Sequence, residues 1–205
     1  KSSSKDFYHL PGGTDAIDEG ILLWLESGDL SYCLFVDELL REARNVSSMS
    51  GDKFRCELWK ATLPGGPDQW LVAKPQTFMN LSGECVQPLA AWHRITPDRI
   101  LVVHDELDLL PGRMKFKKGG GNAGHNGLKS ITQRLGTPDF YRLRLGIGRS
   151  PHGGEDTVNW VLGRLTPADQ DAFRKLAPAA VDVVRLFVQG DVPAATHAAN
   201  SFVLE

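Results

Sequence analysis

The sequence predicts an α/β protein in which helices are layered on a β-sheet, and three observations support this fold class. Segments typical of strands alternate with segments typical of helices, which is the pattern of an α/β layer fold. Ile100-Leu101-Val102-Val103 is a continuous β-branched and aliphatic run, as expected for a strand buried on both faces. The chain has 205 residues and no internal repeat or dividing linker, so we expect a single domain with one sizeable core.

The first half of the chain predicts one helix and two or three strands. The apolar run Ile21–Leu25 fits either a short buried strand or one helical turn, because its length does not decide between them. Val36–Ala43 is expected to be an amphipathic helix, since its apolar residues recur every three or four positions. Alternating residues in Phe54–Leu63 and Trp70–Ala73 predict two strands, joined by the turn Pro64–Asp68.

The second half continues this alternation. A helix is predicted from Gly83 to His93, and it ends where Ile95-Thr96-Pro97-Asp98 interrupts the pattern. The other expected elements are, in order, the strand Ile100–Val103, a short basic strand Lys115–Lys118, a helix Leu128–Leu135, a strand Tyr141–Ile147, a long helix from Thr166 to about Val188 and a last helix Val192–Asn200. Thr166 is the expected cap of the long helix, and Pro167 is its expected first residue.

A glycine-rich turn, residues 119–124, joins the basic strand to a His125-Asn126 pair at the expected start of the next helix. Glycines let a ligand approach the backbone closely, and a helix N-terminus offers unpaired N–H groups to an anion. The glycines also satisfy G-x-G-x-x-G, but the preceding strand lacks the buried apolar run of a dinucleotide-binding unit. A surface turn without a ligand is the other alternative, and His125-Asn126 argues against it.

The basic residues are unevenly distributed, although the formal net charge is only −2. From Arg113 to Arg149 there are nine Lys or Arg residues and one acid, Asp139. This patch suggests a polyanionic partner at one face of the protein. A basic face that is merely solvated would give the same pattern.

The cysteines and the apolar runs bear on the compartment. Cys33, Cys56 and Cys85 show neither a disulfide framework nor metal-type spacing, which favours a reducing compartment. Ile21–Leu25, the longest strongly apolar run near the start, is too short for a membrane span or a secretory segment. We therefore expect a cytoplasmic protein outside the membrane. We also expect it to be a monomer. The chain does not begin with Met, which is typical of a missing or processed N-terminal segment.

Three groups of polar residues follow the expected strands and loops: Asn80, His104-Asp105-Glu106 and His125-Asn126. Asparagine amides can donate to a developing oxyanion or position a water molecule. A carboxylate can orient and charge-stabilise a histidine base. Because no Gly-x-Ser-x-Gly elbow and no credible nucleophilic cysteine is present, direct attack by water is favoured.

Each group also has a structural alternative. Asn80 is placed to cap the following helix, and Asp105 and Asp108 are placed to form a turn before Pro111-Gly112. A third alternative is a metal site built from His104, Asp105, Glu106 and His125. No recognised ligand spacing supports that site.

Four segments, taken together, carry a resemblance to a known family. They are Lys74-Pro75-Gln76-Thr77-Phe78-Met79-Asn80-Leu81-Ser82-Gly83, Val103-His104-Asp105-Glu106-Leu107-Asp108, residues 119–129, and Phe140-Tyr141-Arg142-Leu143-Arg144-Leu145-Gly146-Ile147-Gly148. In order and spacing they resemble bacterial-type peptidyl-tRNA hydrolase, over about Val36 to Glu205. The resemblance implies a single α/β domain, residues 1–205, with a mixed twisted sheet wrapped by helices. It implies hydrolysis of the ester between a peptide and the 3′ end of tRNA, which recycles tRNA in translation, without a metal or cofactor.

The resemblance also implies roles for individual residues. Asn80 and Asn126 look like the amides that position substrate and water, and Asp105 looks like the partner of the catalytic histidine. The implied substrate-binding residues are Phe78, Met79 and His125. The implied tRNA-binding bases, which reach phosphates near the acceptor end, are Lys115, Lys117 and Arg144.

Residues 1–34 depart from the family. Its members open with a strand ending in Gly-x-Gly-Asn-Pro-Gly, then a Tyr, then Thr-Arg-His-Asn, whose His is the general base. An alignment without gaps puts Asp29 at that His and places the first strand near residues 13–18, which is a poor strand sequence. Ile21–Leu25 fills the vacant sheet position if the register shifts. His9 is the only histidine of residues 1–34, and nothing around it matches the motif.

Two hypotheses follow from this departure. The first is an active hydrolase whose N-terminal segment is altered, or whose general base comes from an unrecognised place. The alternative is a relative that binds tRNA or similar RNA without hydrolysing it, because the family's histidine motif is missing. The side chain within hydrogen-bond reach of Asp105 is the observation that bears most on the choice.

Overall fold

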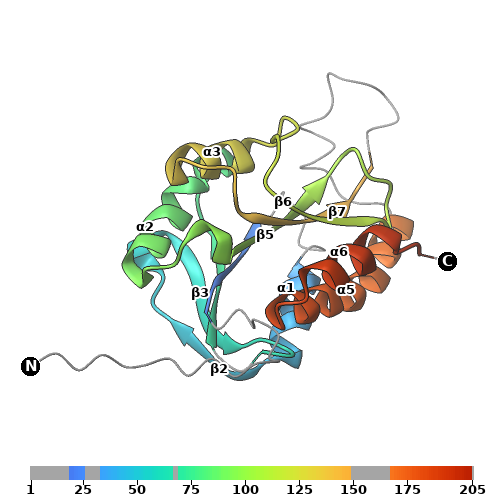
Figure 1. Ribbon diagram of the computed structural model, residues 1–205, viewed down its shortest axis with the longest axis horizontal. Coiled ribbons are helices and arrows are strands. Elements are labelled where there is room, and N and C mark those ends of the chain that lie inside the picture. The colour runs from blue at the N-terminus through green and yellow to red at the C-terminus, as the bar shows by residue number, and fades with distance from the viewer. Residues whose placement is uncertain (1–18, 26–32, 67–68, 149–166, 205) are drawn as a thin grey trace, which may run out of the picture.

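A mixed seven-stranded sheet with helices on both faces forms the framework of the computed structural model (Figure 1). The structure describes residues 19–25, 33–66, 69–148 and 167–204. The strands are β1 Ile21–Leu25, β2 Arg44–Met49, β3 Cys56–Thr62, β4 Gln69–Pro75, β5 Ile100–Glu106, β6 Met114–Lys118 and β7 Tyr141–Gly146. The helices are α1 Cys33–Glu42, α2 Gly83–His93, α3 Asn126–Leu135, α5 Pro167–Val188 and α6 Val192–Ser201, with the 3-10 turns η2 Asp52–Phe54, η3 Met79–Leu81 and η4 Pro97–Arg99. The predicted α/β fold class is confirmed.

The strand order is β2-β3-β4-β1-β5-β7-β6, so β1 lies in the interior of the sheet. It pairs in parallel with β4 and with β5, and all five of its residues are buried. A strand flanked by parallel neighbours and covered on both faces is apolar throughout, which explains why Ile21–Leu25 shows no alternation. The ambiguity over this segment is thereby resolved in favour of a strand. The first strand therefore lies later in the sequence than residues 13–18, where the alignment without gaps placed it. This is the register shift described above for Ile21–Leu25.

Other elements agree with the predictions to different degrees. The helix Gly83–His93 has the predicted bounds, whereas β5 runs three residues beyond Val103 and so includes Asp105 in the strand. The helix expected from Leu128 begins two residues earlier, at Asn126. The exposed edge strand β2 was not predicted. Thr166, the expected cap of the long helix, lies outside the described residues.

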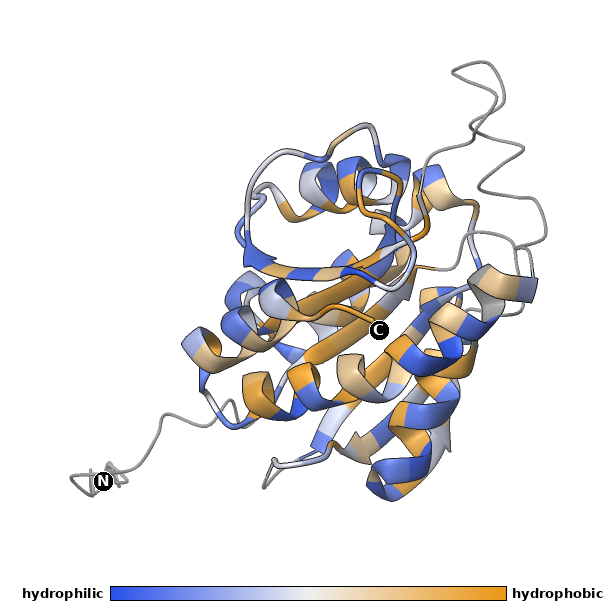
Figure 2. Cartoon of the chain, turned by 90° about the vertical axis from the view of Figure 1, so that its right-hand side faces the viewer, coloured by the Kyte–Doolittle hydropathy of each residue, from blue (hydrophilic) through white to orange (hydrophobic). Residues whose placement is uncertain are grey.

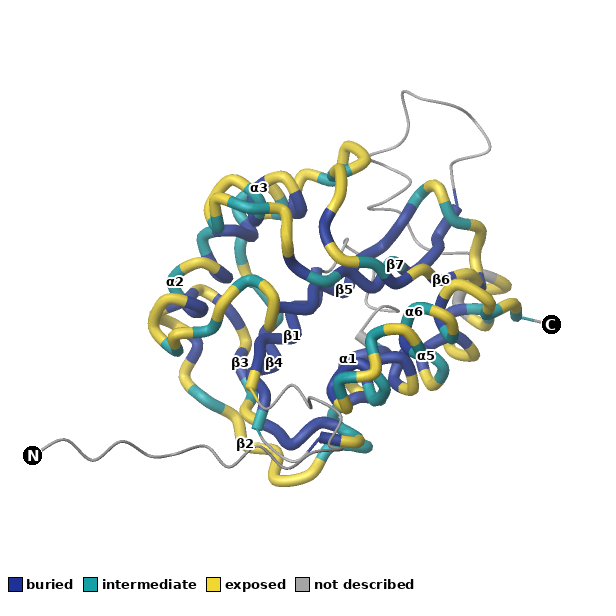
Figure 3. Tube along the Cα trace, viewed as in Figure 1, coloured by how far each residue is buried: buried dark blue, intermediate teal, exposed yellow. Residues whose placement is uncertain are grey.

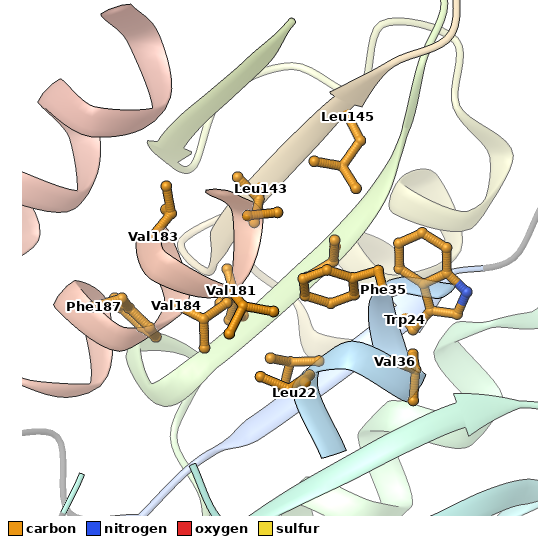
Figure 4. Close-up of a cluster of buried hydrophobic side chains, with 14 of the residues drawn as sticks. Leu22, Trp24, Phe35, Val36, Leu143, Leu145, Val181, Val183, Val184 and Phe187 are labelled. Carbon is orange, nitrogen blue, oxygen red and sulfur yellow. The ribbon is translucent and has the colours of Figure 1, made fainter. Parts of the chain in front are cut away.

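The core consists of two apolar layers, one on each face of the sheet. Figure 4 shows the layer beneath α1, α5 and α6, where Phe35 and Phe187 pack against strand residues such as Leu143. The second layer lies beneath α2 and α3 and includes Val86, Leu128 and Ile131. The central strands are hydrophobic along their length and buried (Figures 2 and 3). Full burial of one such side chain contributes about 1.5–3 kcal/mol, so the sheet is a stable platform for the loops at its edges.

None of the helices in the described ranges is long and apolar enough to cross a membrane. Cys56 and Cys85 are both buried free thiols.

Candidate active site

Asp105, near the end of β5, faces a histidine from a distant part of the chain. Its carboxylate is buried, with 5% of the residue exposed, and its Oδ1 lies 3.5 Å from Nε2 of His125. The ring of His125 also packs edge-on against the ring of His104, with 4.8 Å between the ring centroids. Within the described residues, His125 is therefore the histidine whose ring nitrogen faces the Asp105 carboxylate. Asp105 is part of a strand, so the alternative that it forms a turn is wrong.

His125 also caps helix α3. Its Nδ1 accepts from the backbone N–H groups of Gly127, at 3.1 Å, and of Leu128, at 3.3 Å. Because Nδ1 accepts, the neutral ring carries its proton on Nε2, which faces Asp105. The expectation that these helix amides are open to an anion is wrong, since the histidine occupies them. A general base needs a lone pair directed at water, and neither nitrogen of His125 offers one in this arrangement.

His104 is held in a fixed neutral state beneath this pair. Its Nδ1 donates to the backbone carbonyl of Asp105 at 2.6 Å, and the residue is almost fully buried. Burial is the main cause that lowers the pKa of His104, and together with the smaller effect of the neighbouring His125 it brings the pKa to about 3. A neutral His104 ring adds no positive charge beside Asp105.

We expect acid to destabilise the fold through His104. In the unfolded chain His104 protonates near its ordinary pKa of 6.5, whereas in the folded protein it stays neutral until about pH 3. Between these values the unfolded state binds the extra proton, so the free energy of unfolding falls as pH is lowered. Urea denaturation at pH 7 and pH 4 should show a smaller fall for His104→Asn than for the wild type. His197→Asn, at an exposed histidine of α6, should behave as the wild type. An equal fall in His104→Asn would contradict this assignment.

Asn80 and Met79 lie in η3, directly before α2. The N-cap of α2 is Ser82, so the alternative that Asn80 caps this helix is wrong. Asn80 is exposed, and Phe78 beside it is 80% exposed. Met79 reaches α3, because a Cβ added at Gly127 would lie 2.7 Å from its Sδ. These contacts bring η3 to the end of α3 that carries His125 and Asn126.

Asn126 is the first residue of α3 and is exposed. The same glycine, Gly127, is near Leu25 at the end of β1, since an added Cβ would lie 2.9 Å from Leu25 Cδ1. The start of α3 therefore lies close to η3 and to the ends of β1 and β5. This arrangement supports the prediction that Asn80, Asp105 and Asn126 share one site.

The glycine-rich turn owes its composition mainly to backbone geometry. Gly119, Gly120 and Gly124 have φ values of 66°, 92° and 78°, in the left-handed region that favours glycine. The turn follows β6, an edge strand that pairs with β7 in the antiparallel sense. A dinucleotide-binding turn instead follows a strand of a parallel βαβ unit. The dinucleotide alternative therefore lacks its structural context here.

The predicted tRNA-binding bases share one face of β6 and β7. Lys115 stands opposite Arg144 in the sheet, and Lys117 stands opposite Arg142. Met114, Phe116 and Leu143 alternate with them and point into the core, so the four bases lie on the other face. A small pocket between these strands and the glycine turn is lined by His104, Glu106, Lys117, Gly121, Asn122, Ala123, Leu128, Arg142 and Arg144.

Glu106 orients Arg144 within this pocket. Its Oε2 accepts from Nε of Arg144 at 2.8 Å and from Nη2 at 2.7 Å, and both side chains are largely buried. Burial lowers the pKa of Lys117, and the charges of Arg144 and Arg142 lower it further. An excess of positive charge beside one carboxylate favours an anionic ligand. Among the described residues, no three His, Cys, Asp or Glu side chains are grouped so as to hold a metal ion.

Comparison with known proteins identifies the family of the chain. A sequence model described as peptidyl-tRNA hydrolase matches residues 33–204. The chain belongs to the peptidyl-tRNA hydrolase family. The peptidyl-tRNA hydrolase of Nitratidesulfovibrio vulgaris strain Miyazaki F is 63% identical over 172 residues, which are 82% of this chain and 85% of that protein. The peptidyl-tRNA hydrolase of Desulfovibrio desulfuricans is 54% identical over 166 residues, 81% of this chain and 72% of that protein.

The fold is also that of the peptidyl-tRNA hydrolase family. The crystal structure of peptidyl-tRNA hydrolase from Acinetobacter baumannii has a TM-score of 0.82 at 31% identity, and covers 93% of this chain and 99% of that one. The matched family segment begins at residue 33, so β1 lies outside it and still occupies the interior of the sheet.

Proposed function

We propose that this chain hydrolyses the ester bond between a peptide and the 3′ end of tRNA. The observation that supports this function most directly is that Asp105 lies beside His125, the residue next to Asn126. This end of α3 is packed against η3, which carries Met79 and Asn80. Family membership supplies the substrate class, because relatives 63% and 54% identical to this chain are peptidyl-tRNA hydrolases. The family and the names of these relatives do not favour binding without hydrolysis.

The site offers two kinds of group that assist water attack on an ester, which are amide donors for the oxyanion and a buried carboxylate. As water adds to the ester carbonyl, negative charge develops on its oxygen. We propose that the amides of Asn80 and Asn126, which are both exposed, donate to it. Asp105 supplies negative charge and holds the ring of His125. Met79, Phe78 and His125 provide surface for the substrate. This chemistry uses neither a metal nor a cofactor.

We propose that Lys115, Lys117 and Arg144, on one face of β6 and β7, bind the tRNA. Lys115 is exposed, Lys117 is partly buried, and Arg144 is oriented by Glu106. Fixed cations beside a hydrolytic site bind phosphates and set the register of the ligand without reading its sequence. We also propose a reducing, cytoplasmic setting, which agrees with the free thiols of Cys56 and Cys85. The monomeric state stays a prediction.

Removal of two bases should change the salt dependence of tRNA binding. If Lys117 and Arg144 contact phosphates, the slope of log affinity against log salt should flatten by about one unit for each charge removed. Filter binding over a range of KCl concentrations should therefore give a slope shallower by about two units for a Lys117→Ala, Arg144→Ala variant. Lys60→Ala, on β3 toward the other edge of the sheet, should keep the wild-type slope. An unchanged slope in the double variant would show a merely solvated basic face.

The function itself is tested by single-turnover cleavage of an N-acetylaminoacyl-tRNA with the protein in excess, which separates chemistry from binding. Release of the acylated amino acid above the rate in buffer supports the proposal. Tight tRNA binding with cleavage no faster than in buffer would overturn it in favour of a binding protein.

A further inference from the structure

Arg142 is buried, in contrast to what its position on the basic face suggests. The alternation along β7 places it beside Lys117, on the side away from the Leu143 layer. Yet its exposed fraction is 0%, whereas Lys115 on the same face is exposed. A fully buried guanidinium costs free energy unless its N–H groups are satisfied, so its contacts indicate what it does.

The partners of Arg142 are backbone carbonyls of the glycine turn. Its Nη1 donates to the carbonyl of Gly121 at 2.8 Å, and its Nη2 donates to the carbonyl of Gly120 at 3.0 Å. The guanidinium carbon also lies 4.7 Å from the ring centroid of Phe140. No carboxylate pairs with Arg142 in the part of the chain that the structure describes. The hydrogen bonds of its guanidinium therefore go to the backbone of the glycine turn.

The turn is short and leads directly to the candidate site. Its first residue, Gly119, donates to the carbonyl of Phe140 at 2.9 Å, and Asn122 accepts from the hydroxyl of Thr132 at 3.3 Å. The N–H of His125 donates to the carbonyl of Asn122 at 2.8 Å. Between these hydrogen bonds at the two ends of the turn, the two bonds from Arg142 hold its middle at Gly120 and Gly121.

We propose that Arg142 is a positioning residue that fixes the glycine turn on β7 and thereby places His125 and Asn126 for the reaction. This role rests on the proposed ester hydrolysis, and it differs from phosphate binding by the neighbouring bases. Because the two planar donors of arginine match two successive carbonyls, a lysine at this position keeps the charge but does not replace both bonds. Misplacement of a reacting group by about 1 Å can reduce a rate about 10²-fold.

The test compares Arg142→Lys with Arg99→Lys, a matched change at an exposed arginine of η4. Arg142→Lys should lower the single-turnover rate constant about 10–10²-fold. Its affinity for uncharged tRNA and the salt slope of that affinity should stay at the wild-type values. Arg144→Gln should behave differently, with weaker tRNA binding and a flatter salt slope. Arg99→Lys should match the wild type in all three measurements.

Hydrogen exchange followed by mass spectrometry gives a readout that does not depend on activity. Arg142→Lys should exchange faster in peptides covering residues 119–126, while peptides from β1 and β5 keep wild-type exchange. A general loss of stability would instead speed exchange in all of these peptides and would overturn the specific role. An unchanged rate constant, or a salt slope that flattens as in Arg144→Gln, would also overturn it. If the wild type itself does not cleave the substrate, the proposed function fails, and the exchange result alone decides whether Arg142 anchors the turn.

Discussion

In single-turnover assays, this chain is expected to cleave a model peptidyl-tRNA about 10²–10⁴ times more slowly than a family member that carries Thr-Arg-His-Asn, because a general base supplies about that factor. No histidine occurs between His9 and His93, so the segment around β1 does not supply that base. His125 does not replace it, since Nδ1 caps α3 and Nε2 faces Asp105. The two asparagine amides and Asp105 remain, so cleavage should still exceed the rate in buffer.

A chimera provides the control for this expectation. Replacement of residues 1–35 by the family's strand, glycine loop and Thr-Arg-His-Asn segment should restore the rate, while tRNA affinity stays the same. The affinity is unaffected because the basic face on β6 and β7 is untouched. Equal rate constants for the wild type and the chimera would show that another group acts as base. His125→Ala would then be the first variant to examine, because His125 lies beside Asp105.

Asn126→Ala is expected to lower the single-turnover rate constant about 10²–10³-fold, the usual cost of one donor to a developing oxyanion. Asn126 is exposed at the start of α3, beside the His125 that contacts Asp105. Asn126 belongs to a helix rather than to a loop, so its replacement removes a donor carried by a rigid element. Rate constants measured with the protein in excess, together with the affinity for uncharged tRNA, separate this effect from binding.

Gln133→Ala is the matched control, since Gln133 is an exposed amide on the same helix. It should leave both the rate constant and the affinity unchanged. If Asn126→Ala weakens tRNA binding but keeps the rate constant, the amide binds substrate and does not assist the chemistry. That result would contradict the role proposed for Asn126.

Helices and strands with a clear hydrophobic period could be predicted from the sequence. Strands that form only through pairing with neighbouring strands could not. The helix Gly83–His93 has the predicted bounds because its apolar pattern and its breakers are local. Ile21–Leu25 has no period, and only its pairing with β4 and β5 makes it a strand. The edge strand β2 has an exposed sequence and forms through backbone bonds to β3, so no apolar pattern marked it.

The same distinction applies to the candidate site. Asn80, Asp105 and Asn126 were selected from the sequence by their chemistry and by the family resemblance. The contact of Asp105 with His125 joins β5 to α3, and no local pattern encodes it. The alternation along β7 gave the correct face for Arg142, but not its burial, because the carbonyls that cover it belong to the glycine turn.

The most direct measurement is release of the acylated amino acid from an N-acetylaminoacyl-tRNA, followed in parallel for the wild type, Asn126→Ala and buffer alone. The proposed site predicts release by the wild type above the buffer rate, and a loss of about 10²–10³-fold in the variant. Release no faster than in buffer, with tRNA still bound, would contradict the hydrolase function. Equal release by the wild type and Asn126→Ala would contradict the proposed site.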